Sequence, residues 1–388
     1  MPNSPPALLP GLAPAAAALS GTGILPYQMI REMLRANEVF APSPIDLAQV
    51  QPASLDLRLG AVAYRVRSSF LPGPAARVEE KLIQLGMHQI DLRDGAVLEK
   101  GCVYIVPLQE KLQLPSRISA FANPKSSTGR LDIFTRLIAD RTSAFDRIEA
   151  GYCGPIFLEV APRTFSIKVR EGDRLNQIRF RRGQPVTSAA ALKRLHEQFR
   201  LTDTAPGRET FRDDSIAVSL DLSGDQLGGL IGFRANPHAD VIDVSRLQHY
   251  DPLDFWEPIY RRSGHGIVLS PGEFYILATK ESVTVPPDHA AEMMAYDAMV
   301  GEFRVHYAGF FDPGFGYTAD AGGRISGAKA VLEVRSHDVP FMLEHEQIVG
   351  WLRYEKLAAI PDRLYGQGVG SSYQGQGLML AKQFKPLG

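Results

Sequence analysis

The sequence predicts a mainly β protein built from two tandem units, each a distorted β-barrel or jelly-roll-like fold with a few short helices. Runs of β-forming residues recur between Gly/Pro turns: PASLDLRLG (52–60), KGCVYIVPL (100–108), GPIFLEVAP (154–162) and LNQIRFRR (175–182). Such alternating or clustered apolar residues are typical of strands with buried faces. Helical spacing occurs in residues 26–39, which begin at a proline, and in 189–200. Many short strands with few helices favour a barrel or sandwich.

An internal repeat predicts that there are two units. PASLDLRLG (52–60) returns as AVSLDLSG (217–224), and VYIVPLQEKLQLP (103–115) returns as FYILATKESVTVP (274–286). A third block, EAGYCGPIFLEV (149–160), has its counterpart between Asp312 and Val334, and the order is the same in both halves. Three matches in one order indicate a duplication. We therefore predict a flexible tail over 1–22, a first unit over 23–200, a linker over 201–214 and a second unit over 215–388.

The composition excludes several classes of partner. The 388 residues carry a formal net charge of −1, which provides no bulk attraction to nucleic acid or anionic lipid. No apolar run reaches the roughly 18 residues that a membrane span needs. Two cysteines exclude a disulfide scaffold and favour a reducing, cytoplasmic compartment. Any anion site must therefore be local.

The stretch NPKSSTGRLD (123–132) places two basic and two hydroxyl side chains just after a predicted strand: Lys125, Ser126, Ser127 and Arg130. A turn at this place can direct all four groups, with backbone N–H groups, toward one polyanion such as a triphosphate. A solvated surface turn has the same composition. The stretch alone therefore leaves both interpretations open.

Glu159 lies inside the apolar strand GPIFLEVAP. A buried carboxylate needs an ion-pair partner or hydrogen bonds, or it takes up a proton, and in the last case it can serve as a general base. The alternative is a structural ion pair with an arginine of 175–182. Near the C-terminus, LYGQGVGSSYQGQG (364–377) interleaves glycines with Tyr, Ser and Gln, which suits either a lid over a polar ligand or a frayed tail.

The sequence lacks the motifs of zinc and nucleotide-loop enzymes. Cys102 and Cys153 are isolated, and no His-x-Glu is combined with a Pro-Cys-x-x-Cys, as a zinc-dependent nucleobase deaminase requires. Neither a Walker A loop nor a Rossmann glycine fingerprint is present. An enzyme of this sequence would use water activated by a carboxylate.

Together these motifs resemble the dCTP deaminase family, the zinc-independent branch of the trimeric dUTPase-like fold, in its long bacterial form with two repeats. Lys125 to Arg130 match the family's Arg-Ser-Ser-x-x-Arg, and Glu149 to Glu159 match its Asp-Pro-Gly-x-x-Gly…Leu-Glu block. Gln177 matches the glutamine of its Ile-x-Gln strand. The segment from Tyr365 to Gln376 matches its closing lid, Tyr-Gly…Ser-Lys-Tyr-Gln-Gly-Gln.

The resemblance implies hydrolysis of dCTP to dUTP and ammonia, with Glu159 as the base that activates water. Ser126 and Arg130 would position that water and stabilise the developing charge. The implied substrate-binding residues are Lys125, Ser127, Arg147, Glu149, Gln177, Tyr365, Ser372 and Gln376. Lys125 and Ser127 would hold the phosphates, with Mg²⁺ bound through the substrate triphosphate, and Glu149 would contact the deoxyribose. The family also implies a homo-oligomer, with a trimer favoured.

Several positions depart from the family's pattern. Residues 131–146 are longer than the family's segment, and Ser372 stands where the lid has lysine. The second unit keeps Asp312 and Glu333 but has Asp297 and Gly301 in place of Ser126 and Arg130. We therefore expect a catalytic first unit and a degenerate second unit that supplies the lid. A bifunctional enzyme that releases dUMP and pyrophosphate, and a non-catalytic nucleotide sensor, are the alternatives.

Overall fold

The computed structural model describes residues 21–185, 187–225, 227–262, 266–294, 303–306, 309–319, 325–336, 338–366 and 375–387. Nearly all of the predicted tail, and Ser372, lie outside these residues. The fold class is confirmed: the chain is mainly β, with five short α-helices among the described residues. Among those helices, none is long and apolar enough to cross a membrane.

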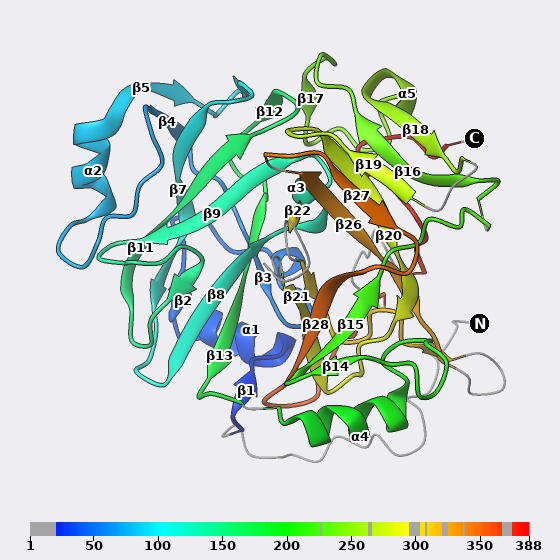
Figure 1. Cartoon of the computed structure of the whole chain (residues 1–388). Helices are drawn as coiled ribbons and strands as arrows, with labels where there is room; N and C mark the ends of the chain where they lie inside the picture. The colour runs from blue at the N-terminus through cyan, green and yellow to red at the C-terminus, as the bar shows by residue number, and fades with distance from the viewer. Residues whose placement is uncertain are drawn as a thin grey trace, which may run out of the picture.

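The first half forms two packed sheets (Figure 1). One has the order β1-β13-β8-β10 with β3 beside β13, and the other has the order β5-β4-β7-β11-β9 with β2 beside β7. Its elements are β1 (Gly23–Ile24), α1 (Tyr27–Arg35), β2 (Val39–Phe40), a 3₁₀ turn (Leu47–Gln49), β3 (Leu55–Leu57), β4 (Val62–Val66), α2 (Val78–Leu85), β5 (Gly86–Asp91), β6 (Ala96–Leu98), β7 (Val103–Gln113), β8 (Ile118–Pro124), α3 (Ser126–Gly129), β9 (Ile133–Ala139), β10 (Arg147–Ile148), β11 (Cys153–Pro162), β12 (Ile167–Val169) and β13 (Asn176–Arg182).

The second half repeats this plan with sheets β14-β15-β28-β21-β23 and β18-β16-β20-β26-β22. Its elements are α4 (Ala189–Phe199), β14 (Phe211–Arg212), β15 (Ser215–Ser219), β16 (Leu230–Ala235), β17 (Ile242–Asp243), α5 (Pro252–Phe255), β18 (Trp256–Tyr260), β19 (Gly266–Leu269), β20 (Phe274–Val283), β21 (His289–Met294), β22 (Phe303–His306), β23 (Phe310–Phe311), β24 (Thr318–Ala319), β25 (Ile325–Ser326), β26 (Ala328–Ser336), β27 (Phe341–Glu344) and β28 (Ile348–Lys356).

Matching hydrogen bonds show which positions of the two halves correspond. The N–H of Gly60 donates to Pro107 O at 2.8 Å, and the N–H of Asp221 donates to Ala278 O at 3.0 Å. Asp221 therefore corresponds to Gly60. Matching the two segments at their shared SLDL letters, which pairs Asp221 with Asp56, was wrong by four residues. The error arose because a shift by an even number of residues leaves the inward and outward pattern of a strand unchanged.

Helix α4 belongs to the second half. We predicted that it closes the first unit, but its Leu192 and Leu195 pack into the second hydrophobic core, together with Leu201. Residues 211–212 of the predicted linker pair with β15, so part of that segment is a strand. The second core therefore takes in residues that we assigned to the first unit and to the linker.

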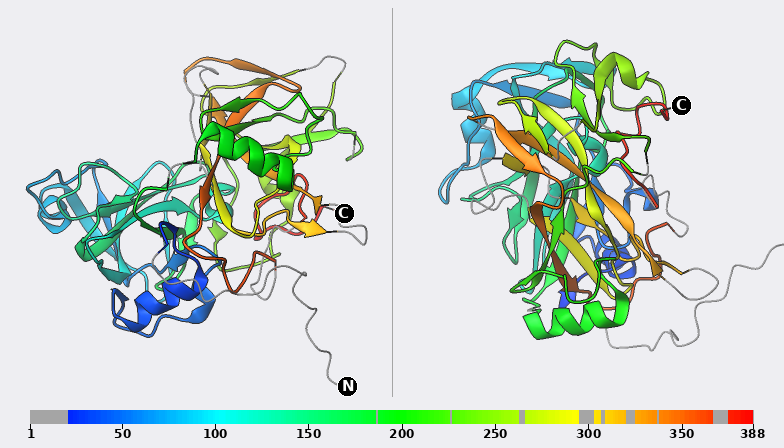
Figure 2. Two further views of the ribbon diagram at one scale, coloured as in Figure 1. Left: turned by 90° about the horizontal axis from the view of Figure 1, so that it is seen from below. Right: turned by 45° about the vertical axis from the view of Figure 1, so that its right-hand side comes forward.

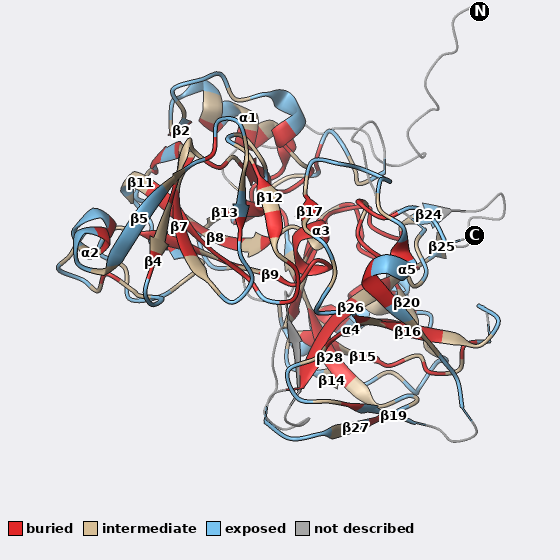
Figure 3. Cartoon of the chain, turned by 90° about the horizontal axis from the view of Figure 1, so that it is seen from above, coloured by how far each residue is buried: buried red, intermediate tan, exposed pale blue. Residues whose placement is uncertain are grey.

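The two halves lie side by side and share a buried boundary (Figure 2). Strand β12 of the first half pairs in parallel with β17 of the second, and Ile24 forms a parallel bridge with Leu357. Figure 3 shows buried segments of α3 and β26 near the middle of the molecule, where the halves meet. This boundary holds the candidate site.

Candidate active site

A cavity of about 460 Å³ lies between the two halves and is lined by both. The residues that line it include the predicted Lys125, Ser126, Ser127, Arg130, Gln177, Tyr365 and Gln376. Most of the predicted site residues that the structure describes therefore meet in this cavity. The second half contributes two carboxyl groups to the same cavity, those of Asp312 and Glu333.

The basic cluster sits on the short turn α3, which follows directly from β8. The N–H of Lys125 and the hydroxyl of Thr128 both donate to Leu175 O, at 3.0 and 2.7 Å, and these bonds fix the turn against the strand that leads into β13. Arg130 is buried, and its guanidinium donates to Gln376 Oε1 at 2.8 Å and to Met379 O at 3.0 Å. The C-terminal segment therefore closes over the cluster and holds Arg130 in place.

A group of cations surrounds one buried carboxylate at the end of the cavity near Lys125. Asp56 forms ion pairs with Lys125 and, at 3.7 Å, with Arg174. Lys382 lines the same wall, and burial together with the nearby Lys125 lowers its pKa. Asp173 also lines the cavity here, and three cations against two carboxyl groups still leave an excess of positive charge, which suits a polyanion. Sequence reasoning missed Lys382 because an isolated lysine in the tail carries no motif.

Glu333 is the buried carboxyl group of this cavity. Burial raises its pKa to about 8, although Arg130 opposes the rise. Within the described part of the chain, Glu333 forms no ion pair. The residue is buried, with only 5 % of its surface exposed. A carboxyl group with such a pKa can exchange protons near neutral pH.

Asp312 lies in the same wall and is held by the first half. Arg179 donates to Asp312 Oδ1 at 3.0 Å, and its guanidinium also lies 4.0 Å from the ring of Phe310. Burial raises the pKa of Asp312, and Arg179 opposes that rise. The fully buried Arg179 thus fixes the loop that carries Asp312.

Glu159, our predicted general base, does not line this cavity. On β11 it faces Arg136 of β9, whose Nε and Nη2 donate to Glu159 Oε1 at 2.9 and 2.6 Å. Arg136 in turn lies over the ring of Phe145 at 3.6 Å. Placing Glu159 with Ser126 and Arg130 was wrong, and the alternative of a structural ion pair holds, although with Arg136 and not with an arginine of β13.

Arg147 and Glu149 were also placed wrongly. Both line a separate cavity of about 590 Å³, together with Arg77 and Tyr152. One physical reason explains the positions of Arg147, Glu149 and Glu159. The basic turn of the first half faces the acid-bearing strand of the second half, so the acids of the first half lie elsewhere. The repeat held the signal for this, because Glu333 and Asp312 are the counterparts of Glu159 and Glu149.

The predicted lid is described at both of its ends. Tyr365 packs against Phe315 with ring centroids 5.6 Å apart, and its N–H donates to Pro313 O at 2.8 Å. At the other end, Gln376 joins Arg130 to the backbone of Lys329 by donating to Lys329 O at 3.1 Å. Ser372 lies between these ends, outside the described residues.

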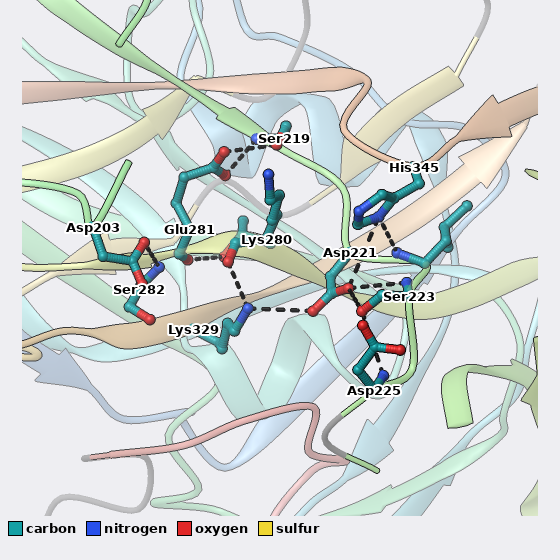
Figure 4. A network of polar contacts seen from close by, with 12 residues as sticks. Asp203, Ser219, Asp221, Ser223, Asp225, Lys280, Glu281, Ser282, Lys329 and His345 are labelled. Carbon is teal, nitrogen blue, oxygen red and sulfur yellow. Dashed lines mark hydrogen bonds and ion pairs between the residues drawn. The ribbon is translucent and has the colours of Figure 1, made fainter. Parts of the chain in front are cut away.

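A polar network supports Lys329 on the side away from the cavity (Figure 4). Its ammonium donates to Asp221 Oδ2 at 3.3 Å, while Asp221 Oδ1 accepts from the hydroxyl of Ser223 at 2.7 Å. His345 Nδ1 accepts from the N–H of Leu222 at 3.1 Å. The network ties the start of β26, and with it the contact to Gln376, to the loop after β15.

The residues at the cationic end also fit a magnesium–triphosphate complex. Within the described residues, no group of three or more His, Cys, Asp or Glu is placed to hold a metal ion. Asp56 is the carboxylate of this end, and its Oδ1 has no hydrogen-bond partner among the described residues. That oxygen is the protein group able to face an ion carried by the phosphates.

Known family models match both halves of the chain. Residues 21–184 match the family model of the 2'-deoxycytidine 5'-triphosphate deaminase N-terminal domain, and residues 188–384 match that of the C-terminal domain. A solved structure described as 2'-deoxycytidine 5'-triphosphate deaminase from Agrobacterium tumefaciens is 55% identical, with a TM-score of 0.81, over 87% of this chain and 99% of that chain.

Two curated relatives carry the name "dCTP deaminase, dUMP-forming". The protein from Beutenbergia cavernae is 31% identical over 145 residues, which is 36% of this chain and 64% of the relative, so less than two thirds of that protein is covered. The protein from Persephonella marina is 28% identical over 168 residues, 40% of this chain and 82% of the relative.

Proposed function

Because this chain belongs to the dCTP deaminase family, we propose that it hydrolyses the 4-amino group of dCTP in the cavity between its halves. One observation carries the proposal: a buried carboxyl group of raised pKa, Glu333, lies in the same cavity as Ser126 and Arg130. The carboxylate of Glu333 takes the role that we first gave to Glu159. The two halves thus supply complementary parts of one site.

The reaction follows from these groups. The Glu333 carboxylate takes a proton from a water molecule, whose oxygen bonds to C4 of cytosine. The Ser126 hydroxyl orients this water, and the Arg130 guanidinium stabilises the charge that develops. Glu333 passes this proton to the ring N3, then takes the proton of the new hydroxyl on C4 and gives it to the amino group. The C4–N bond breaks, ammonia leaves, and a uracil ring remains.

The rest of the cavity binds the nucleotide. Lys125, Ser127 and Lys382 hold the triphosphate. Mg²⁺ carried by the phosphates would neutralise part of their charge, and Asp56 is the residue that would hold it. Asp312 occupies the position that corresponds to Glu149 and is assigned to the deoxyribose. Tyr365 and Gln376, at the two described ends of the predicted lid, line the cavity and limit the access of bulk water to the nucleotide.

A second candidate is a bifunctional enzyme that releases dUMP and pyrophosphate. The names of the relatives from Beutenbergia cavernae and Persephonella marina favour it. Asp312 is a second buried carboxyl group in the cavity and can act on a second water near the phosphates. Deamination is common to both candidates, and only the fate of the triphosphate differs.

Product analysis tests both candidates. Purified protein is incubated with dCTP, CTP or dCMP, ammonia is measured, and the nucleotides are separated. We expect ammonia chiefly from dCTP. Uridine nucleotide recovered as dUMP with pyrophosphate identifies the bifunctional enzyme, and recovery as dUTP identifies the deaminase.

Two variants assign the base. Glu333→Gln should lower kcat for deamination about 10³-fold or more, since it removes the proton acceptor. Glu159→Gln should retain the wild-type rate. The reverse result would return the catalytic role to Glu159.

A further inference from the structure

A buried ion pair crosses between the halves next to the reacting groups. Arg335 of β26 donates from Nη2 to Asp132 Oδ2, and side-chain exposures of 9% and 1% show that water hardly reaches the pair. Thr164 completes the contact: it accepts from Arg335 Nη2 at 3.0 Å and donates to Asp132 Oδ2 at 2.5 Å. Asp132 and Thr164 belong to the first half, and Arg335 belongs to the second.

Each partner lies two residues from a catalytic group. Arg335 follows Glu333 on β26, where residues at spacing two point to the same face of a strand. Asp132 follows Arg130 at the end of the turn α3, and its N–H donates to Gly129 O at 2.9 Å. A movement of either partner is therefore passed to a group in the cavity through a single intervening residue.

The backbone at Asp132 shows that this position is specially held. Its φ of +53° lies in the left-handed region, which is unfavourable for a residue with a side chain. Such a conformation persists only where surrounding contacts determine it. Arg335 and Thr164 hold the carboxylate of Asp132, and the N–H of Arg163 donates to Asp132 O at 3.0 Å. These contacts keep the backbone in this conformation.

We infer that Arg335 and Asp132 form a positioning pair that sets Glu333 against Arg130 across the boundary between the halves. The inference rests on the proposed function, because it takes Glu333 and Arg130 as the reacting groups. A buried ion pair adds little net stability over well-packed apolar residues. Such a pair fixes the relative position of two strands or turns better than apolar side chains do, because its hydrogen bonds have direction.

The positioning role predicts a specific kinetic pattern. The proposed triphosphate-binding residues Lys125, Ser127 and Lys382 line the cavity, whereas neither Arg335 nor Asp132 is among the described residues that line it. Loss of the pair should therefore leave KM within about twofold of wild type. A carboxylate displaced by about 1 Å from its working geometry can cost about 10²-fold in rate, so kcat should fall.

Three variants separate positioning from stability. Arg335→Met leaves Asp132 buried without its partner, and we expect the lowest thermal stability of the set. Arg335→Met/Asp132→Asn removes both charges and should recover most of the stability, while kcat stays about 10- to 100-fold low. Arg335→Lys keeps the charge but loses the planar guanidinium group. Its kcat should therefore lie between that of the wild type and that of the double variant. Wild-type kcat in the double variant would overturn the inference.

A second pair between the halves is the matched control. Arg181 and Glu355 contact each other at 2.6 Å between β13 and β28, and neither lines the cavity. Arg181→Met should lower stability with kcat unchanged. A loss of kcat as large as in the double variant would show that any loosening of the boundary slows the reaction, which would overturn a specific role for Arg335.

The crystal structure of the double variant separates this inference from the proposed function. If wild-type protein releases no ammonia from dCTP, the proposed function fails, and the pair is judged on geometry alone. A shift of β26 against α3 by about 0.5 Å or more supports the positioning role. Unchanged placement of Glu333 against Arg130 contradicts it.

Discussion

Glu333 and Glu159 show how one residue type acquires different chemistry from its surroundings. Both lie in apolar strands that contain Leu-Glu-Val, and both are buried. Glu159 accepts two hydrogen bonds from Arg136. Glu333 has no such partner among the described residues, and burial raises its pKa. Among the described residues, the two carboxyl groups thus differ in the arginine that pairs with Glu159.

The raised pKa of Glu333 predicts the pH dependence of the reaction. Its ordinary value of 4.5 is raised to about 8, so the carboxyl group of the free enzyme is mostly protonated at pH 7. Catalysis needs the carboxylate, so kcat/KM should rise about tenfold per pH unit below pH 8 and level off above it. A profile that is flat from pH 6 to pH 9 would contradict the assignment.

The same shift predicts a change in stability. A raised pKa in the folded state means that the contribution of Glu333 is full below about pH 4.5 and is lost as the pH rises toward 8. Glu333→Gln carries no charge and escapes this loss. Urea denaturation should therefore show the variant gaining stability relative to wild type between pH 5 and pH 9. If the free energies of unfolding of the variant and the wild type differ by the same amount at pH 5 and at pH 9, Glu333 titrates normally.

Arg136 is predicted to be structural. In Arg136→Met, Glu159 stays buried at 1 % exposure without its partner, and breaking such a pair typically costs about 3 to 5 kcal/mol. Urea denaturation measures the loss, while kcat with dCTP should not change. Arg136→Met/Glu159→Leu is the control and should recover most of the stability. A single variant as stable as wild type would show that the pair contributes nothing.

At the scale of elements, a bulge shapes the strand pair that carries Glu333. Between β20 and β26 the register shifts from Ala278 opposite Val331 to Ser282 opposite Lys329. Thr279 fills the gap, since its hydroxyl accepts from Ala330 N–H at 3.0 Å and donates to Glu281 O at 2.8 Å. Strands β7 and β11 of the first half shift their register at the corresponding place.

Thr279→Val should destabilise the protein because it removes this hydroxyl from a fully buried place. Two buried backbone groups lose their partner, and each such loss costs about 1 to 3 kcal/mol. Thermal unfolding measures the effect. Thr279→Ser keeps the hydroxyl and should lie much closer to wild type. Equal stability of the Val and Ser variants would show that packing, and not hydrogen bonding, maintains the bulge.

At the scale of the whole molecule, each half lacks what the other retains. The first half keeps Lys125, Ser126 and Arg130, and its acid is tied up by Arg136. The second half keeps Glu333, and its sequence has Asp297 and Gly301 at the positions of the basic cluster. The arrangement described here therefore builds one complete site from a single chain.

Nucleotide titration tests this arrangement. Calorimetry of Glu333→Gln with dCTP and Mg²⁺ should give one nucleotide bound per chain, since the variant binds substrate without turning it over. Arg130→Met/Lys125→Met, which lacks two groups of the site, is the control and should bind much more weakly. A stoichiometry of two per chain would show that the cavity lined by Arg147 and Glu149 also takes dCTP.

The sequence by itself determined the strands, the doubling and the chemistry of the basic turn. These properties depend on residue types at local spacing, and the motif from Lys125 to Arg130 lies within one turn and one strand end. It also predicted, through likeness to a known lid, that Tyr365 and Gln376 bind the substrate, and both line the cavity.

Only the tertiary structure decided which acid meets the basic turn. Glu159 and Glu333 are alike in sequence, and local pattern does not distinguish them. The choice depends on how two whole sheets pack, because α3 of the first half faces β26 of the second while β11 pairs Glu159 with Arg136. Lys382 and the pair of Arg335 with Asp132 were missed for the same reason. Contacts between residues some 200 positions apart leave no periodic trace in the chain.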